Sequence, residues 1–501
     1  MKNILTSIIF ILAFSSLFSQ EVNGLIVSSD NQFKVVKVWG THEERGYAVG
    51  YLLADGIDDL FSNYLLPAFG SFYTTARNLM ATDAHIKIDS IYIYEAMAMA
   101  DGINETGLMS MEIDYIDVLL ANSFLDFQNF LGKGLGLDNG CSSLISWGTA
   151  TTETDLNGKS VMSRHLDWDD QPVIIRNQVM IIHFPEEENE QPWLLIGFAG
   201  QMSVLSGFNQ SGVAIMQHML SNESTGASPN KSYEPVWFSM RKAIEIDDHN
   251  NDGFNNCLDI NSVINENLNG YANSYIITGV ASSTNIDDDK IATIIEIAPA
   301  IPYITTRNTD YEDGIPNQNL YAANSSIARN NQLNYCTRYN AVMANIGSGT
   351  LIGTQENWEL MLNYSSSCGF GGYGNIQFMQ YVPENNYLKL AYHTIGGVQA
   401  CENIPIVYDT QELFEMVTVV TSPKLKSKIN VYPNPAATQV SVYIPDETID
   451  EVLTVFNSSG VLVKTQIARK GENKIDISHL LPGNYFIRLR NSELKARFVI
   501  N

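Results

Sequence analysis

A glycine–cysteine pair and a pair of charged residues further along constrain this chain more than any other feature. Cys141 follows Gly140 and precedes an apolar run, and Arg164 and Asp167 stand three positions apart. Between the two pairs, residues 155–159 (DLNGK) have the Asn-Gly composition of a β-hairpin turn. If this hairpin forms, its second strand brings both charges back beside the thiol. A cation and a carboxylate beside a thiol are the groups that nucleophilic catalysis requires.

Structural roles are the alternative for these residues. A lone cysteine is more often a buried apolar residue than a nucleophile, and an Arg–Asp pair is often an ordinary surface pair. A strand packed against another layer tolerates two charges poorly unless they face a partner. Residues three apart also point to opposite faces of a regular strand. For both Arg164 and Asp167 to reach Cys141, we therefore expect a bend or a strand end between them.

Length and charge restrict the class of protein. The chain has 501 residues, which is enough for a large core and an accessory module. Its 55 acidic and 29 basic residues give a formal net charge of −26, which argues against binding to nucleic acid or to anionic membrane surfaces. Residues 1–20 combine a lysine, an apolar run and a serine-rich end, and they predict a signal peptide. No later segment reaches the ~18 apolar residues of a membrane span, so we expect a secreted protein without one.

The cysteine count is odd. With five cysteines, an exported chain leaves at least one thiol unpaired. Cys141 is the natural candidate because its neighbours suggest chemistry. Cys257, Cys336, Cys368 and Cys401 could form two disulfides, and the sequence does not choose the pairing.

Apolar periodicity divides the rest of the chain into segments. Residues 21–140 predict a mostly helical N-terminal segment. Its helices are expected around residues 43–57, 92–100 and 113–130. Residues 141–217 have the pattern of short strands, and helices and strands then alternate to about residue 420.

The last part of the chain has a different composition. Residues 421–428 are polar and basic and predict a linker, and short alternating runs over residues 429–501 predict a small all-β sandwich. Its opening, residues 431–435 (VYPNP), and its ending, residues 481–488 (LPGNYFIR), resemble a type IX secretion C-terminal sorting domain. This resemblance implies export by the type IX secretion machinery of a Gram-negative cell, to the cell surface or beyond. The alternative is a carbohydrate-binding or adhesive sandwich.

Three motifs around Cys141 resemble one enzyme family. They are residues 139–148 (NGCSSLISWG), 158–168 (GKSVMSRHLDW) and 206–215 (SGFNQSGVAI). Together they are similar to the N-terminal-nucleophile (Ntn) hydrolases of the penicillin acyltransferase, bile-salt hydrolase and acid-ceramidase group. The resemblance implies an α+β fold, a four-layer αββα Ntn-hydrolase sandwich over residues 141–420, with Cys141 at the start of a central strand. Residues 21–140 would then be propeptide-like.

The resemblance also implies a reaction. The thiol of Cys141 attacks the carbonyl of Gly140, the bond between them breaks, and the freed α-amine, whose ordinary pKa is near 8, serves as general base. Glycine has no side chain to obstruct this approach or the strained backbone that it requires. In this scheme Asp167 holds the amine and Arg164 stabilises the thiolate. No catalytic cofactor is implied.

Two later residues and one departure complete the resemblance. Asn324 and Arg338 resemble the late Asn and Arg elements of the group. Asn324 would donate to the oxyanion of the tetrahedral intermediate, and losing one such donor typically costs about 3 kcal/mol. Where bile-salt hydrolases have a second oxyanion Asn, this chain has Gln217 and His218, and neither is a firm substitute. This departure leaves the substrate class open.

A separate motif predicts a metal site. Residues 248–259 (DHNNDGFNNCLD) fit the D-x-N-x-D-G pattern of a calcium loop, between two segments that could be helical. The ligands would be the side chains of Asp248, Asn250, Asp252 and Asp259 and the carbonyl of Phe254. Position 12 is Asp instead of the usual Glu, as in dockerin-type loops. We expect a structural Ca²⁺; the alternative is a solvated acidic turn.

Three functions remain open from the sequence. The first is a self-processed amidase or acyltransferase that cleaves a linear, non-peptide C–N bond of a small amide through an acyl-thioester at Cys141. The second is a phospholipase B-like esterase of the same fold, acting on a lipid-like substrate. The third is a secreted binding or adhesive protein with an inactive hydrolase-like domain, which the presence of Cys141, Arg164 and Asp167 together disfavours.

Overall fold

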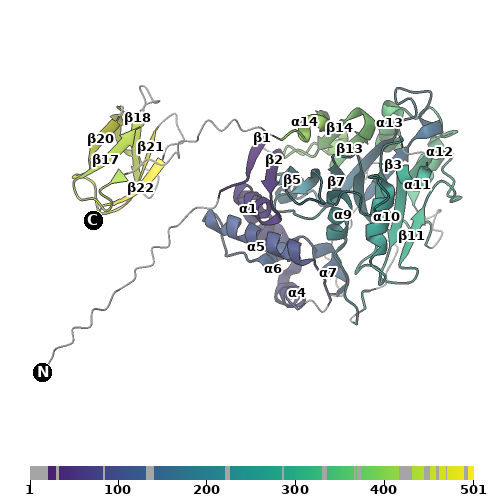
Figure 1. Cartoon of the computed structure of the whole chain (residues 1–501), viewed down its shortest axis with the longest axis horizontal. Helices are drawn as coiled ribbons and strands as arrows, with labels where there is room; N and C mark the ends of the chain where they lie inside the picture. Colours follow the sequence, from purple (N-terminus) through teal and green to yellow (C-terminus); the bar gives the residue numbers. More distant parts are fainter. Residues whose placement is uncertain are drawn as a thin grey trace. The chain divides into compact units, whose positions relative to one another are not determined.

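The structure is a computed structural model of the whole chain, and it divides into two compact units, residues 1–416 and 417–501 (Figure 1). It describes residues 21–29, 33–82, 85–130, 140–220, 226–228, 230–284, 287–329, 336–365, 368, 374–416, 431–444, 452–457, 462–469, 471–489 and 495–500. The predicted signal peptide and the predicted linker over residues 421–428 lie outside these described residues.

Two sheets form the centre of the first unit. The nine-stranded sheet contains, in spatial order, β1 (Gly24–Ser29), β2 (Phe33–Gly40), β5 (Gln178–Pro185), β6 (Trp193–Phe198), β7 (Ser206–Asn209), β8 (Ala214–Met219), β9 (Tyr275–Val280), β10 (Ala292–Ile297) and β11 (Ile304–Arg307). The six-stranded sheet contains β12 (Asn319–Ala322), β3 (Cys141–Ser146), β4 (Val161–Trp168), β13 (Gly374–Val382), β14 (Tyr387–Tyr392) and β15 (Ile406–Asp409). Paired strands are antiparallel, apart from the parallel pair β2–β5.

Side-chain alternation along the strands fills the space on both faces of each sheet. In β5, Met180 and Ile182 join an apolar cluster shared with the six-stranded sheet, whereas Ile181 packs on the other side among helices. In β3, Ile145 joins the shared cluster and Leu144 points away from it. Each sheet therefore buries both faces, one against the other sheet and one against helices.

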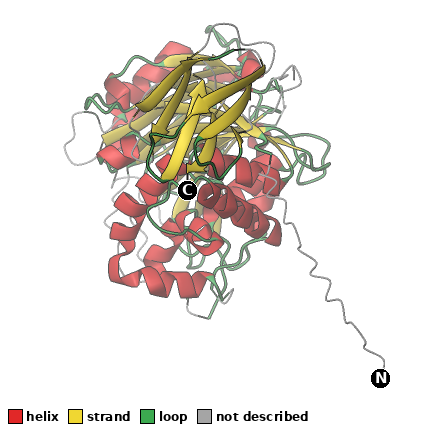
Figure 2. Cartoon of the chain, turned by 90° about the vertical axis from the view of Figure 1, so that its left-hand side faces the viewer, coloured by secondary structure: helices red, strands yellow, loops and turns green. Residues whose placement is uncertain are grey.

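The helices of the first unit pack mainly on the outer faces of the two sheets. They are α1 (His42–Leu52), α2 (Ala54–Leu60), α3 (Leu66–Phe69), α4 (Tyr73–Met80), α5 (Ser90–Glu105), α6 (Tyr115–Ala121), α7 (Phe124–Phe130), α8 (Pro172–Ile175), α9 (Val236–Glu245), α10 (Cys257–Asn265), α11 (Asp288–Ile291), α12 (Thr337–Asn345), α13 (Thr354–Tyr364) and α14 (Thr410–Leu413), with a π-helical turn at Phe61–Leu65. Helices α1, α5, α9 and α10 share a core with the nine-stranded sheet, and α12 and α13 share one with the six-stranded sheet. These helices are red in Figure 2.

Helices α1 and α5 are in backbone contact. A Cβ at Gly46 would overlap the carbonyl oxygen of Glu95, and one at Gly102 would overlap that of Tyr47. Glycine is needed at both positions because nothing larger fits between the two helices. A capping box of Thr41 with Glu44 fixes the start of α1.

The N-terminal segment is less helical than we expected. Strands β1 and β2 precede the helices, and β2 lies next to β5 in the nine-stranded sheet. The three expected helical regions are helical, as α1 with α2, α5, and α6 with α7. Within residues 141–217, where we expected short strands, Ile174 and Ile175 instead lie in the short helix α8, which begins at Pro172.

The second unit consists, in its described residues, of two small antiparallel sheets. One contains β16 (Val431–Tyr432), β17 (Gln439–Ile444) and β20 (Gly471–Asp476), and the other β19 (Leu462–Ile467), β18 (Val452–Asn457), β21 (Gly483–Leu489) and β22 (Lys495–Ile500). Alternate side chains, such as Val440, Val455 and Ile487, form one apolar cluster. In the described residues of this unit, the short alternating runs that we expected over residues 429–501 form strands.

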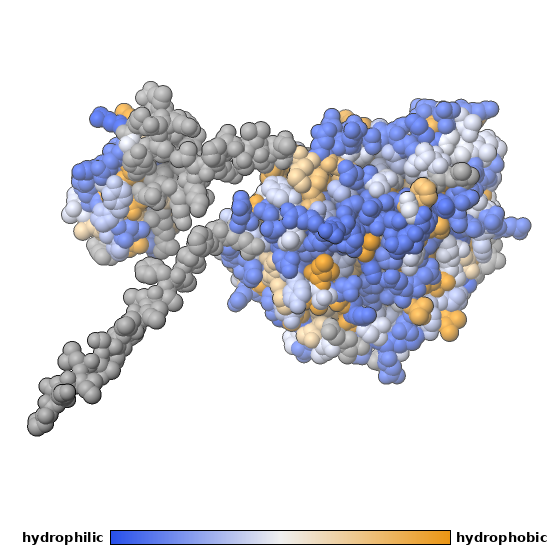
Figure 3. Space-filling view, in the orientation of Figure 1, coloured by the Kyte–Doolittle hydropathy of each residue, from blue (hydrophilic) through white to orange (hydrophobic). Residues whose placement is uncertain are grey.

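Figure 3 shows a visible face of the first unit that is mostly hydrophilic, with scattered apolar positions. Within the described part of the chain, no helix combines the length and apolarity needed to cross a membrane.

Candidate active site

Cys141 is the first residue of β3, and its side chain is 2% exposed. It lies opposite Leu166 of β4, and Ser143 lies opposite Arg164. The hairpin prediction is therefore confirmed. The connection between the strands, residues 147–160, is longer than a tight two-residue turn. It contains Asn157 and Gly158, with φ of 50° and 87°, but this pair does not join the two strands directly.

Arg164 approaches the thiol from the side of the nine-stranded sheet. Its Nη2 lies 3.9 Å from Sγ of Cys141 and donates to the carbonyl of Gln217 at 3.0 Å. Its Nη1 donates to the hydroxyl of Ser206 at 3.0 Å. The guanidinium is fully buried and is held by strands β7 and β8 of the facing sheet. It thus places a fixed positive charge beside the sulfur.

Asp167 approaches from the opposite side of β4. Its Oδ2 lies 3.4 Å from Nη1 of Arg338, and its Oδ1 accepts from Asn375 at 2.7 Å. Its backbone N–H donates to the carbonyl oxygen of Gly140 at 2.7 Å. Asp167 therefore lies beside the peptide that precedes Cys141, whereas Arg164 lies beside the thiol.

The bend that we expected in β4 is absent. Arg164 and Asp167 alternate regularly and point to opposite faces, while the register irregularity lies in β13, opposite this part of β4. Both charges reach the site because Cys141 begins its strand. At this strand end the thiol of Cys141 faces the nine-stranded sheet. The peptide bond before Cys141 can be reached from the opposite face of the six-stranded sheet, where Asp167 lies.

Asn324 and Arg338 complete the group. Oδ1 of Asn324 accepts from the backbone N–H of Cys141 at 2.9 Å and also from Nη2 of Arg338. Nη1 of Arg338, in the first turn of α12, donates to the carbonyl of Cys141 at 3.2 Å. In the intact chain, Nδ2 of Asn324 donates to the carbonyl of Met219 at 2.7 Å, so it must be released before it can bind an oxyanion. The structure thus brings all five predicted catalytic residues together; their roles stay predictions.

Gly140 is constrained by space and not by backbone strain. Its φ is not positive. A Cβ here would lie 3.0 Å from Oδ2 of Asp167 and 3.5 Å from Nη1 of Arg338. We expected that a strained backbone would require glycine at this position. The structure gives a steric reason instead, because the carboxylate of Asp167 occupies the space that a side chain at position 140 would need.

Burial sets the protonation of the thiol. It raises the pKa of Cys141 above its ordinary value, against the opposing effect of the Arg164 guanidinium. The carboxylate of Asp167 acts in the same direction as burial. In the intact chain the sulfur is therefore a neutral thiol at neutral pH, and it needs to lose its proton as it attacks.

Gln217 and His218 do not point to a second oxyanion site. His218 is buried, and its Nε2 lies 2.9 Å from the hydroxyl of Ser143. Burial lowers its pKa well below the ordinary value. The side-chain oxygen of Gln217 accepts from Trp237 at 3.2 Å. Both side chains are satisfied inside the fold.

An apolar cavity of about 80 Å³ lies next to this site. Trp168, which follows Asp167 in β4, is one wall, and Trp237 is another. Most of the remaining lining residues lie in α2, the π-helical turn, α5, α6 and the end of β6, and they include Ile57, Phe61, Ile103, Val118 and Phe198. Cys141 belongs to the same apolar cluster as these residues. The N-terminal segment therefore supplies most of a hydrophobic pocket beside the candidate nucleophile.

The cysteines separate into one pair and three free thiols. Cys368 and Cys401 form a disulfide, whereas Cys141, Cys257 and Cys336 are free and buried. The possibility of two disulfides is therefore wrong, and the expectation of an unpaired Cys141 is confirmed.

The predicted calcium loop has helices on both sides, α9 and α10. Asp248 accepts from the amides of Asp252 and Gly253, and Asn250 from that of Asp252. Asp252 accepts from the amide of Phe254. The two oxygens of Asp259 accept from Asn250 and Asn256. The chemistry of these oxygens suits Ca²⁺, and the calcium site stays a prediction.

Among the described residues, His42, Glu190 and Glu245 form a possible metal-binding cluster, because their three ligand atoms lie within 4.8 Å of one another. This cluster does not suit a metal. Nδ1 and Nε2 of His42 are both taken by carboxylates, those of Glu95 at 2.6 Å and Glu190 at 2.7 Å, and Arg241 lies against the same group. Burial would lower the pKa of His42, but these hydrogen bonds raise it to about 9. A protonated imidazole cannot bind a cation.

Comparisons with known proteins give a family for the second unit. Residues 430–501 match the secretion system C-terminal sorting domain. The predicted sorting domain is therefore confirmed, and it indicates export to the cell surface or the extracellular space through the type IX machinery.

Similarity in the first unit is weaker. Proteins dcd1B and dcd1A of Dictyostelium discoideum are 23% and 21% identical over 229 and 251 residues, which are 43% and 45% of this chain. The chain spans about half the length of these curated relatives, 43% and 53%.

Two solved structures are also similar. The Caenorhabditis elegans N-acylethanolamine-hydrolyzing acid amidase ortholog has a TM-score of 0.34 at 13% identity, covering 48% of this chain and 93% of that one. A conjugated bile acid hydrolase from Clostridium perfringens has a TM-score of 0.33 at 10% identity, covering 54% and 93%. TM-scores of this size do not decide the activity, which depends on the geometry of the site.

Proposed function

We propose that this chain is the precursor of an exported, self-processing cysteine hydrolase of the Ntn type, which breaks a linear amide C–N bond. The geometry at one peptide bond supports the proposal best. The thiol of Cys141 lies beside Arg164, the carbonyl of Gly140 accepts from the backbone of Asp167, and the amide of Cys141 donates to Asn324. The groups that self-cleavage needs thus surround a single bond. In this proposal the two packed sheets and their helices correspond to the four-layer αββα sandwich, and the tail to a small all-β sandwich.

The processing step uses groups already in contact. Sγ of Cys141 attacks the carbonyl carbon of Gly140, the C–N bond breaks, and the thiol proton passes to the nitrogen of Cys141. Water then hydrolyses the resulting thioester, which leaves a carboxylate on Gly140 and a free α-amine on Cys141. The N–H of Asp167 stabilises the oxygen of Gly140 while it carries negative charge.

The same residues would then act on substrate. The α-amine of Cys141, positioned by Asp167, takes the thiol proton and passes it to the leaving amine while the sulfur forms an acyl-thioester. Water then hydrolyses the thioester, which releases the acid and restores the thiol. Arg164 stabilises the developing thiolate. Because the adjacent cavity is lined almost wholly by apolar side chains, the acyl group of the substrate is proposed to be apolar.

Mass spectrometry of the secreted protein tests this function. A mature chain that begins at Cys141 is expected for the wild type, and an intact Gly140–Cys141 bond for Cys141→Ala. Amide and ester probes with the same apolar acyl chain then separate an amidase from a phospholipase B-like esterase. An Ala variant that still splits at this bond would show that an outside protease acts. A wild-type chain that stays intact and turns over no probe would favour the inactive binding protein.

A further inference from the structure

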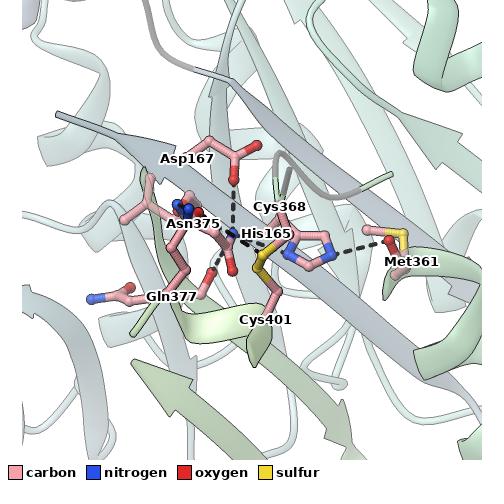
Figure 4. Close-up of a disulfide and its surroundings, with 9 residues drawn as sticks. His165, Asp167, Met361, Cys368, Asn375, Gln377 and Cys401 are labelled. Carbon is pink, nitrogen blue, oxygen red and sulfur yellow. Dashed lines mark hydrogen bonds between the residues drawn. A yellow bond between two sulfur atoms is a disulfide. The ribbon is translucent and has the colours of Figure 1, made fainter. Parts of the chain in front are cut away.

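Asn375 is a buried residue that the sequence analysis did not select. It lies on β13 directly opposite Asp167 of β4, with its side chain fully buried. Its Nδ2 lies 2.7 Å from Oδ1 of Asp167 and 3.1 Å from Nδ1 of His165 (Figure 4). An amide nitrogen has two hydrogens and no acceptor capacity. The two hydrogens on Nδ2 of Asn375 are therefore donated to Asp167 and His165, one to each.

His165 can only accept at Nδ1. Its Nε2 lies 3.1 Å from the carbonyl oxygen of Met361, which must accept, so the ring hydrogen is on Nε2. Burial lowers the pKa of His165 to about 3, so the ring is neutral. It also stacks on Phe378, with the ring centroids 3.9 Å apart. The ring is thus fixed in orientation and in tautomer, and it fixes the amide of Asn375 in turn.

These contacts restrict the orientation of the Asp167 carboxylate. Because Asn375 donates to Oδ1, that oxygen is held in place and kept as an acceptor. The other oxygen, Oδ2, remains on the side of Gly140 and Arg338. This is the side on which cleavage would create the α-amine of Cys141.

We propose that Asn375, oriented by His165, is a positioning residue that aims Oδ2 of Asp167 at the backbone nitrogen of Cys141. The inference rests on the proposed function, because it assigns a role within that reaction. Asn375 touches neither the thiol nor the scissile carbonyl in the described structure. It acts through Asp167, by fixing the direction and the ionised state of the carboxylate that holds the amine.

The backbone of Asn375 is braced from the other side. Its N–H donates to Oε1 of Gln399 at 3.0 Å. Gln399 immediately precedes a short 3₁₀ turn, Ala400–Glu402, which contains Cys401 of the disulfide. Figure 4 shows the disulfide beside the chain of hydrogen bonds from Met361 through His165 and Asn375 to Asp167. The disulfide therefore ties down the segment that supports Asn375.

The test uses the full-length precursor made by cell-free synthesis, with cleavage at Gly140–Cys141 followed by intact mass across a range of pH. Asn375→Leu keeps the size of the side chain but removes the donor. The nitrogen of Cys141 takes up the thiol proton as it leaves, so the Asp167 carboxylate that faces it has to be held during cleavage as well. We expect cleavage to slow about tenfold or more, since the hydrogen bond that holds this carboxylate is lost. We also expect the acid limb of the pH profile to move to higher pH, because the carboxylate of Asp167 is less stabilised. Asn375→Ser, which keeps a donor, should recover part of the rate.

Asn357→Leu is the matched control. Asn357 is also a buried asparagine against β4, where it accepts from the hydroxyl of Ser163, but it does not contact Asp167. Its loss should lower stability without moving the acid limb. If the wild type splits and Asn375→Leu splits at the same rate with the same acid limb, the positioning role is wrong and the proposed function stands.

A wild-type precursor that never splits would overturn the proposed function instead. The hydrogen bond from Asn375 to Asp167 is then tested by ¹³C NMR titration of the Asp167 carboxyl. The signal of this carboxyl is assigned by its loss in Asp167→Asn. A raised midpoint in Asn375→Leu would keep Asn375 as the group that holds this carboxylate. An unchanged midpoint would overturn that as well.

Discussion

The backbone N–H of Asp167 donates to the carbonyl oxygen of Gly140 at 2.7 Å, so β4 holds the carbonyl that the thiol of Cys141 would attack. The bond continues the antiparallel pairing of β3 and β4 by one residue before the start of β3. A donor placed there before reaction needs no rearrangement when negative charge develops on the oxygen. In the proposed reaction the hairpin would therefore do more than bring Asp167 near: its own backbone would supply the oxyanion donor for self-cleavage.

The first prediction concerns the space at Gly140. Gly140→Ala should slow cleavage of the precursor by about tenfold or more, because a Cβ 3.0 Å from Oδ2 of Asp167 pushes the carboxylate and the scissile peptide apart. Intact mass over time measures the rate. Gly396→Ala is the control, since a Cβ there meets only Thr394 at 3.7 Å. Equal rates for the Gly140→Ala variant and the wild type would show that this contact is not needed.

Much of the site could be predicted from local sequence, because it depends on one hairpin. Residues 147–160, which include Asn157 and Gly158, return the chain alongside β3, and the pairing of β3 with β4 brings Arg164 and Asp167 to Cys141. The sides from which the two charges approach could not be predicted. They depend on Cys141 being the first residue of its strand, and strand ends are poorly defined by sequence patterns.

Contacts between residues that are far apart in the sequence could not be predicted from local sequence patterns. Asn375 is 208 residues from Asp167, and only the pairing of β4 with β13 brings them together. Strand β2 was missed for a similar reason. Val36 and Val38 face helices, but the neighbours Val35 and Lys37 are buried as well, because β2 lies inside the sheet next to β5. A strand buried on both faces lacks the alternation that identifies strands at a surface.

The second prediction concerns the apolar cavity. Ala121 is part of its lining, and Ala121→Phe should narrow the space. We expect turnover of long apolar acyl amides to fall while short ones are still accepted, because only the long chain needs the cavity. Self-cleavage serves as the internal control, since it uses no external acyl group. A uniform loss for all chain lengths would mean that the cavity does not hold the acyl chain.

The third prediction concerns the disulfide. Cys368 and Cys401 are 33 residues apart, and closing a loop of this size stabilises a fold by on the order of 3–4 kcal/mol. Cys401→Ser should lower the melting temperature and also slow self-cleavage, because Gln399 no longer anchors Asn375. Cys257→Ala, which removes a buried thiol outside any disulfide, should leave the rate of cleavage unchanged. A melting temperature that falls without any change in rate would separate the disulfide from the site.

The fourth prediction concerns pH and the first helix of the chain. His42 faces Glu95 of α5, Glu187 and Glu190 between β5 and β6, and Arg241 and Tyr92. Its pKa in the folded state is about 9, above the unfolded value of 6.5. The imidazolium therefore stabilises the fold fully below pH 6.5, and this stability is lost as the pH rises through 9.

Chemical denaturation of the precursor at several pH values measures this effect. The wild type should lose on the order of 2–3 kcal/mol from this group between neutral and alkaline pH. His42→Gln should be less stable at neutral pH and should show a flatter dependence over the same interval. Asp167→Asn in the same assay controls for the active site. An unchanged alkaline slope in His42→Gln would assign the effect to another group.

The last prediction concerns the loop of residues 248–259, where the effect of one substitution should change sign with calcium. Burial raises the pKa of Asp259, and the nearby carboxylates of Asp248 and Asp252 raise it further. Without a cation these charges repel one another, so Asp252→Asn should raise the melting temperature in the presence of a chelator. With Ca²⁺ bound, Asp252 is a ligand, and the same substitution should lower it.

Thermal melts of the wild type and of Asp252→Asn, each with chelator and with Ca²⁺, give the four values needed. A hundredfold excess of Ca²⁺ over its Kd should stabilise the wild type by about 2.7 kcal/mol. Asp310→Asn, in an exposed acidic turn elsewhere, should respond identically in both conditions. If Asp252→Asn has the same effect with and without Ca²⁺, the loop is a solvated acidic turn, because only a bound cation can convert the removal of a repelling charge into the loss of a ligand.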